Sequence, residues 1–287
     1  MRRIASIVAC AALAGAGMVS ATTPAVAKSF VTSPYVALGD SYSSGAGILP
    51  QVLGSPPACS RSQVNYPHDV AAVTQPAAFT DVTCSGAKTS DFFTSQSAGV
   101  PPQLDAVNAD TRLITMTISG NDGGVFVNSF FGCVTVDAGQ VYGNPCQQKY
   151  GTTFVDTINN QTYPALVNTL SAVRAKAPHA KVVILGYPQI LPPVGDPSCY
   201  PSMPYSMGDV PWLVNQQQVA NDAVRRAAEA TGAHYVDTST PSAGHDACAA
   251  PGTRWMEPVT NPVNADPVHP NADGEAAMAR ATLTAIS

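Results

Sequence analysis

Three short polar motifs in this chain hold residue types that could carry out acyl transfer. Gly39-Asp40-Ser41 supplies a serine hydroxyl, Gly120-Asn121-Asp122 supplies a side-chain amide, and Asp266-Pro267-Val268-His269 supplies an imidazole. A serine hydroxyl is a poor nucleophile until a base such as histidine takes its proton. Attack on an ester carbonyl then creates an oxyanion, which needs preorganised hydrogen-bond donors such as an amide. The three motifs together therefore indicate the chemistry of an activated serine.

The motifs follow predicted strands, and the pattern of elements explains why they could meet. Short apolar runs predict strands at residues 35–38, 113–118, 182–185 and 233–236, with a shorter candidate at 81–84. Helical patterns follow at residues 166–177, at 211–230 before Gly232, and at 272–285 after a capping Asn271. Strands that alternate with helices predict a parallel sheet covered on both faces, with sites at the carboxyl ends of its strands. Three stretches, about 122–160, 188–210 and 238–265, are expected to be irregular.

The N-terminus has the pattern of a secretory signal peptide. Arg2 and Arg3 precede an uncharged apolar run, and Ala25-Val26-Ala27 forms a small-residue cleavage site. The run of about 16 residues is too short to span a bilayer comfortably, and no later segment is long enough. We expect residues 1–27 to be removed after Ala27, leaving one secreted domain at residues 28–287.

The cysteines predict disulfides in that exported domain. Seven cysteines are present, and removal of Cys10 with the leader leaves an even six, which is typical of a disulfide framework. Six cysteines allow 15 pairings. We expect the sequential one, because each pair brackets one loop-rich region: Cys59–Cys84, Cys133–Cys146 and Cys199–Cys248. No C-x-x-C pair occurs, which argues against a zinc site.

Composition excludes several classes of protein. The 287 residues carry a formal net charge of -5, and without the two leader arginines the charge is −7. This acidity argues against a nucleic-acid partner and against attraction to anionic membranes. Only 11% of residues are charged while 45% are hydrophobic, which suits a globular core and not a disordered chain.

With Cys84-Ser85-Gly86-Ala87 added, the motifs stand in the order found in the SGNH hydrolases, also called GDSL esterases and lipases, which the chain resembles from Ser41 to His269. The resemblance implies a three-layer α/β/α sandwich with a mostly parallel five-stranded sheet. It makes Ser41 the nucleophile and His269 the base. The backbone N–H groups of Ser41 and Gly86 and the Asn121 amide would form the oxyanion hole. Asp266 would be the acid that orients His269, although some members use a backbone carbonyl instead.

The resemblance is closest to secreted actinobacterial lipases and esterases, which share a pattern of six cysteines in three disulfides and need no metal or cofactor. It implies a monomeric carboxylic ester hydrolase whose partner is a small-molecule or lipid ester, with no stable membrane insertion. A phospholipase A-type enzyme and a carbohydrate (acetyl) esterase are alternatives within the family. A secreted non-catalytic binding module would be favoured if Ser41, Asn121 or His269 were replaced, and none is. No G-x-S-x-G motif supports an ordinary α/β-hydrolase.

Overall fold

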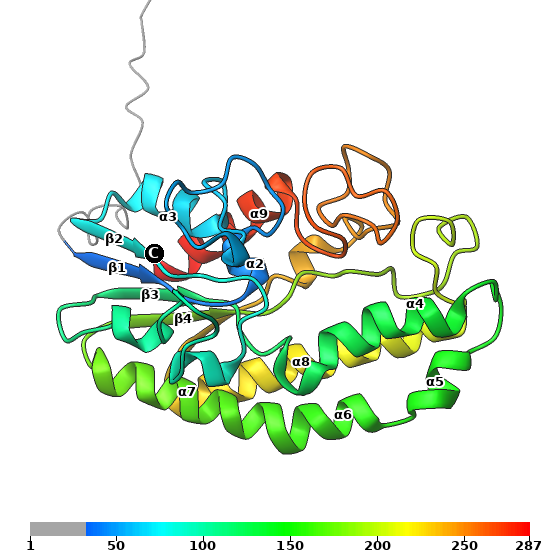
Figure 1. Ribbon diagram of the computed structural model, residues 1–287, viewed down its shortest axis with the longest axis horizontal. Coiled ribbons are helices and arrows are strands. Elements are labelled where there is room, and N and C mark those ends of the chain that lie inside the picture. Colours follow the sequence, from blue (N-terminus) through cyan, green and yellow to red (C-terminus); the bar gives the residue numbers. More distant parts are fainter. Residues whose placement is uncertain (1–32) are drawn as a thin grey trace, which may run out of the picture.

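A parallel sheet organises the molecule (Figure 1). The computed structural model describes residues 33–287, so the predicted leader, with Cys10 and the cleavage site after Ala27, lies outside the described residues. Five parallel strands pair in the order β2-β1-β3-β4-β5. They are β1 (Pro34–Ala37), β2 (Ala78–Asp81), β3 (Leu113–Met116), β4 (Lys181–Leu185) and β5 (His234–Val236). The predicted α/β class and parallel sheet are confirmed.

Helices cover both faces of the sheet. Helices α3 (Tyr66–Thr74) and α9 (Ala272–Ile286) lie on one face, and α7 (Tyr163–Lys176) and α8 (Asp209–Thr231) lie on the other (Figure 1). Alternate strand residues serve the two cores: Leu113 packs on the α3 and α9 side, whereas Ile114 packs on the α7 and α8 side. Because both faces are covered, the carboxyl ends of the strands are left to form a site.

Local signals set the ends of the long helices as predicted. The Asn271 side chain accepts hydrogen bonds from the first turn of α9, and Gly232 ends α8 in the left-handed conformation. The edge strand β2 differs from the prediction, because it covers residues 78–81 and the predicted strand covers residues 81–84. Residues 82 and 84 still follow β1, since their backbone N–H groups donate to Ala37 and Gly39.

The stretch at residues 122–160 is mostly helical, so the expectation that it is irregular was wrong. Its short helices are η4 (Asp122–Gly124), η5 (Val127–Phe131), α4 (Gly132–Asp137), α5 (Pro145–Tyr150), α6 (Thr153–Thr157) and η6 (Ile158–Thr162). They bury Phe130 and Phe154 near the first half of α8, beyond the edge of the sheet (Figure 1). Tertiary packing stabilises helices this short, which have little stability alone. The remaining short helices are α2 (Ser41–Ser44), η1 (Pro57–Cys59), η2 (Thr89–Phe92), η3 (Gln103–Ala106) and η7 (Thr240–Ser242).

Three disulfides tie the connections together in the predicted pairing. Cys59 bonds to Cys84, Cys133 to Cys146, and Cys199 to Cys248. The first joins the segment after α2 to the segment after β2, and the second joins α4 to α5. The third joins two long connections, one after β4 and one after β5.

A buried carboxyl pair holds α4 against α8. Asp209 accepts the backbone N–H groups of Cys146 and Gln147 at 2.9 and 2.7 Å. Asp137 accepts the backbone N–H of Ser206 at 2.9 Å through Oδ2, while its buried Oδ1 has no partner that donates to it. Burial and the neighbouring Asp209 raise the pKa of Asp137 to about 7. A protonated Asp137 can therefore donate from Oδ1 to Asp209.

We expect Asp137→Asn to make the protein more resistant to unfolding above pH 7. The pKa of Asp137 is raised on folding, so its contribution is present at acidic pH and is lost as pH rises through about 7. An asparagine amide donates at every pH, and the gain near pH 8 should be about 1–3 kcal/mol. Urea unfolding at pH 4 to 8 measures this, with exposed Asp110→Asn as the control. Identical pH slopes in wild type and Asp137→Asn would contradict it.

Candidate active site

Ser41 is the first residue of α2, directly after the sharp turn that ends β1. Asp40 caps this short helix by accepting the backbone N–H of Tyr42 at 3.1 Å. Gly39 has a φ of +125°, and a Cβ there would lie 2.4 Å from the carbonyl oxygen of Thr117. Only glycine fits this turn. The turn therefore places Ser41 at the start of α2, at the carboxyl edge of the sheet. The Ser41 residue is 6% exposed.

The Asp40 carboxylate, next to Ser41 in the chain, accepts hydrogen bonds from several strand ends. Its carboxylate accepts the Thr117 hydroxyl at 2.7 Å and the Tyr187 hydroxyl at 2.6 Å. Tyr187 in turn accepts the backbone N–H of Gly120 at 2.7 Å. Burial raises the pKa of Asp40 to about 6. Asp40 thus joins the ends of β1, β3 and β4, which makes it a structural residue of the site.

Gly86 occupies a tight turn after β2. The backbone N–H of Ala87 donates to the carbonyl of Cys84 at 3.1 Å, and Gly86 has a φ of +76°. This conformation at the third position of a turn favours glycine. A Cβ at residue 86 would meet only the Gln96 side chain, at 3.7 Å, so the backbone conformation and not crowding demands glycine here.

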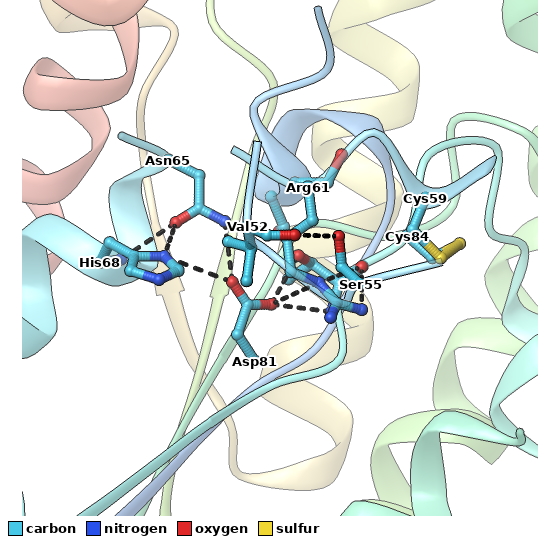
Figure 2. Close-up of polar contacts among 12 residues, drawn as sticks. Val52, Ser55, Cys59, Arg61, Asn65, His68, Asp81 and Cys84 are labelled. Atoms are coloured by element: carbon cyan, nitrogen blue, oxygen red, sulfur yellow. Dashed lines mark hydrogen bonds and ion pairs between the residues drawn. A yellow bond between two sulfur atoms is a disulfide. The ribbon is translucent and has the colours of Figure 1, made fainter. Parts of the chain in front are cut away.

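The segment that leads into the Gly86 turn is anchored to the loop after α2, and Figure 2 shows Asp81 and Cys84 of this segment beside Arg61 and Cys59 of the loop. The Cys59–Cys84 disulfide joins the two segments covalently. Arg61 donates from Nε and Nη2 to the carbonyl of Thr83 at 2.9 and 2.8 Å, and its Nε lies 3.4 Å from Asp81. These contacts hold the turn in one position relative to Ser41.

Asn121 lies at the end of β3, in contact with the same turn. Its amide nitrogen donates to the carbonyl of Ala87 at 3.0 Å, which uses one of its two hydrogens. The neighbouring Asp122 accepts the backbone N–H and the hydroxyl of Thr89, at 2.9 and 2.8 Å. Within residues 33–287, no hydrogen bond occupies the backbone N–H of Ser41 or of Gly86. Three N–H donors at neighbouring strand ends are therefore available to a ligand.

The imidazole of His269 is buried beside α2. It is 8% exposed, and its ring centroid lies 5.0 Å from that of Tyr42 and 5.6 Å from that of Phe126. Nδ1 lies 2.8 Å from the carbonyl oxygen of Pro267, so Nδ1 carries the proton and Nε2 is left as the basic nitrogen. Burial lowers the pKa of His269 below its ordinary value. The ring is therefore held neutral and ready to accept a proton.

The expected pairing of Asp266 with His269 is not what the structure has, because the Pro267 carbonyl occupies Nδ1. The backbone N–H of His269 donates to the Asp266 carbonyl at 3.2 Å, and Val268 has a φ of +63°. Proline followed by a residue of positive φ is the signature of a type II turn, whose central carbonyl points away from the chain reversal. Valine rarely adopts a positive φ, so the contacts around Val268 must hold it in this conformation.

Tyr42 supplies one of those contacts, a role that no motif in the sequence predicts. Its buried hydroxyl donates to the Val268 carbonyl at 2.6 Å. A second contact is the backbone N–H of Asp266, which donates to the Ala46 carbonyl at 3.0 Å. The helix that begins with Ser41 is thus bonded directly to the turn that carries His269. No hydrogen bond joins the Ser41 hydroxyl to His269 within the described chain, and such bonds often form only when substrate is present.

An apolar cavity of about 40 Å³ lies behind Tyr42. Its lining includes Val125, Phe126, Phe130 and Ile190. The two tryptophans lie elsewhere, since Trp212 packs on Phe154 and Trp255 stacks on His245. The cavity offers apolar surface next to the residue that follows Ser41.

Two wider properties bear on the site. Over residues 33–287, no helix is both long and apolar enough to cross a bilayer. The same residues contain no group of three His, Cys, Asp or Glu side chains placed to hold a metal ion.

Comparison with known proteins places the chain among lipases. The model of the GDSL-like lipase/acylhydrolase family matches residues 37–277. Lipase 2 of Streptomyces coelicolor is 51% identical over 274 residues, which cover 94% of this chain and 92% of that protein. The crystal structure of phospholipase A1 from Streptomyces albidoflavus superposes with a TM-score of 0.75 at 32% identity, covering 88% of this chain and 99% of that one. An extracellular lipase from Streptomyces rimosus gives 0.73 at 31% identity, covering 88% and 100%.

Proposed function

Since the chain belongs to the GDSL-like lipase/acylhydrolase family and is a carboxylic ester hydrolase, we propose that it cleaves lipid acyl esters through an acyl-enzyme on Ser41. The observation that carries the proposal is the His269 ring, fixed at Nδ1 by the Pro267 carbonyl and bonded through its turn to the helix of Ser41. A base held in one tautomer beside a serine is the arrangement that nucleophilic acyl transfer requires.

The proposed reaction has two halves. The Ser41 oxygen attacks the ester carbonyl carbon while its proton passes to Nε2 of His269, and the Pro267 carbonyl stabilises the imidazolium at Nδ1. The oxyanion accepts hydrogen bonds from Ser41, Gly86 and Asn121. The bond to the alcohol oxygen then breaks, and His269 gives its proton to that alcohol. Water attacks the acyl-enzyme in the same way, releases the acid and restores Ser41.

The proposed substrate is an ester with an apolar acyl chain. The apolar cavity behind Tyr42 supports this, because such a lining favours hydrocarbon over a polar group. The likeness to a phospholipase A1 supports glycerophospholipids as one form of that substrate. We also propose that the protein is exported, which its three disulfides and an extracellular relative support, and that it works as a monomer, because all the proposed catalytic groups come from one chain.

Labelling of Ser41 tests this function. A fluorophosphonate probe should react with the folded protein at Ser41, because the probe needs an activated serine. Peptide mapping by mass spectrometry locates the label, which Ser85→Ala should keep and Ser41→Ala should lose. Folded protein that takes no label, or takes it at another serine, would contradict the proposed nucleophile.

Asp266→Asn tests the orienting group of His269. Because Nδ1 bonds to the Pro267 carbonyl, we expect kcat to fall less than about tenfold. Loss of the acid from a true triad can cost about 10⁴ in kcat. Steady-state kinetics on a soluble p-nitrophenyl ester distinguish the two, and a loss of 10³ or more would assign the role to Asp266.

A further inference from the structure

The segments around the proposed catalytic residues carry no charge. Residues 45–60 and 258–265 contain no Asp, Glu, Lys or Arg, nor do residues 123–136 and 188–195. Each segment exposes large apolar side chains to solvent: Leu49, Leu53, Val127, Val194 and Val263. Exposed large apolar side chains that lie together on a surface mark an interaction site.

We call three of these side chains the apolar rim: Leu49 and Leu53 from residues 45–60, and Val263 from residues 258–265. They are 77%, 97% and 75% exposed. Leu49 and Val263 line one surface groove although they lie far apart in the sequence. Gly47 packs directly on Asp266, where an added Cβ would lie 2.3 Å from the backbone nitrogen. The apolar rim therefore borders the turn that carries His269.

The part of the apolar rim that holds Leu53 is fixed in place. Residues 51 and 62 form an antiparallel bridge, and the backbone N–H of Val52 donates to the Arg61 carbonyl at 2.8 Å. The Cys59–Cys84 disulfide and the bonds of Arg61 to Thr83 anchor this loop to the Gly86 turn (Figure 2). A loop so restrained presents Leu53 without an ordering cost on binding.

We propose that the apolar rim docks the enzyme onto a lipid surface with uncharged or zwitterionic headgroups, so that an ester leaves the aggregate directly beside His269. This inference rests on the proposed function. Exposed leucines gain free energy on entering the headgroup and acyl boundary, and residues 45–60 and 258–265 carry no charge to desolvate there. The exposed Asp273, which also lines the groove, has to stay in water at its edge. Without the two leader arginines the net charge is −7, which disfavours an anionic surface. The surface therefore fits a neutral lipid interface.

Vesicle binding by an inactive protein tests the docking surface. Ser41→Ala should bind phosphatidylcholine vesicles in a flotation assay, and adding Leu53→Ser or Val263→Ser should each weaken the partition coefficient about tenfold. Val73→Ser is the matched control: Val73 is 48% exposed but lies at the end of α3 that leads back to the start of β2. That control should bind as Ser41→Ala does.

A second test measures activity in enzyme that keeps Ser41 and carries only the Leu53→Ser change. Leu53→Ser should hydrolyse dispersed phosphatidylcholine about tenfold more slowly, yet hydrolyse a dissolved short-chain ester at the normal rate. The docking proposal would be overturned if Ser41→Ala did not bind neutral vesicles, or if the Leu53→Ser and Val263→Ser variants bound them as well as Ser41→Ala does. It would also be overturned if Leu53→Ser lost activity equally on dispersed phosphatidylcholine and on the dissolved ester. Activity surviving in Ser41→Ala would instead overturn the proposed nucleophile and leave the binding result intact.

Discussion

Replacing His269 by alanine should lower kcat about 10⁶-fold on any ester substrate, with the fold intact. In a Ser-His system the loss of the base removes the proton acceptor for the nucleophile and the acid for the leaving alcohol together. The ring is positioned for both steps, since Nδ1 is bound to the Pro267 carbonyl and no hydrogen bond within the described residues occupies Nε2. Endpoint assays with a p-nitrophenyl ester, run for long times at high enzyme concentration and corrected for spontaneous hydrolysis, measure a residual rate this low.

The pH profile of the same enzyme supplies an internal check. Burial lowers the pKa of His269 below 6.5, so kcat/KM of the wild type should rise with pH along a limb that lies below pH 6.5. The residual rate of His269→Ala should lack that limb. His234→Ala, on an exposed residue of β5, is the matched control and should keep both rate and limb. A His269→Ala enzyme within tenfold of wild type would refute His269 as the base.

The central part of the fold could be predicted because its local and tertiary signals agree. Strands β3 and β4 are buried on both faces and therefore appear in the sequence as continuous apolar runs. The edge strand β2 alternates between exposed and half-buried residues over only four positions, which gives a weak pattern. The helices of residues 122–160 are too short to show a period, and the first half of α8 must pack on them before they are stable.

The candidate site likewise has one part that the sequence predicts and one part that it does not. Ser41, Gly86 and Asn121 each follow a strand of a parallel sheet, so strand ends alone place them at one edge. The roles of Tyr42 and Pro267 depend on long-range contacts: the Tyr42 hydroxyl reaches a carbonyl 226 residues away. No sequence period encodes such a contact. A proline after Asp266 indicates a turn, but the type of turn depends on Val268 being held at positive φ.

Asn121→Ala should lower kcat about 10²- to 10³-fold while KM changes little. The amide of Asn121 has one hydrogen committed to the Ala87 carbonyl and one free, so its removal deletes a donor that acts on the oxyanion more than on the ground-state ester. The backbone donors of Ser41 and Gly86 remain, which is why the expected loss is smaller than for His269→Ala. Steady-state kinetics on a soluble ester separate kcat from KM.

The Ala87 bond raises a rival explanation, since its loss could disturb the Gly86 turn itself. If the turn were disturbed, Asn121→Ala would have a lower unfolding midpoint than the wild type. Its fluorophosphonate labelling at Ser41 would also slow by the same factor as its ester turnover. Asn128→Ala, an exposed amide on the neighbouring η5, controls for loss of an asparagine in this region. Because the Cys59–Cys84 disulfide and Arg61 hold the turn independently of Asn121, we expect an unchanged midpoint. A rise in KM that matches the loss in kcat/KM, with kcat unchanged, would instead make Asn121 a ground-state binding group.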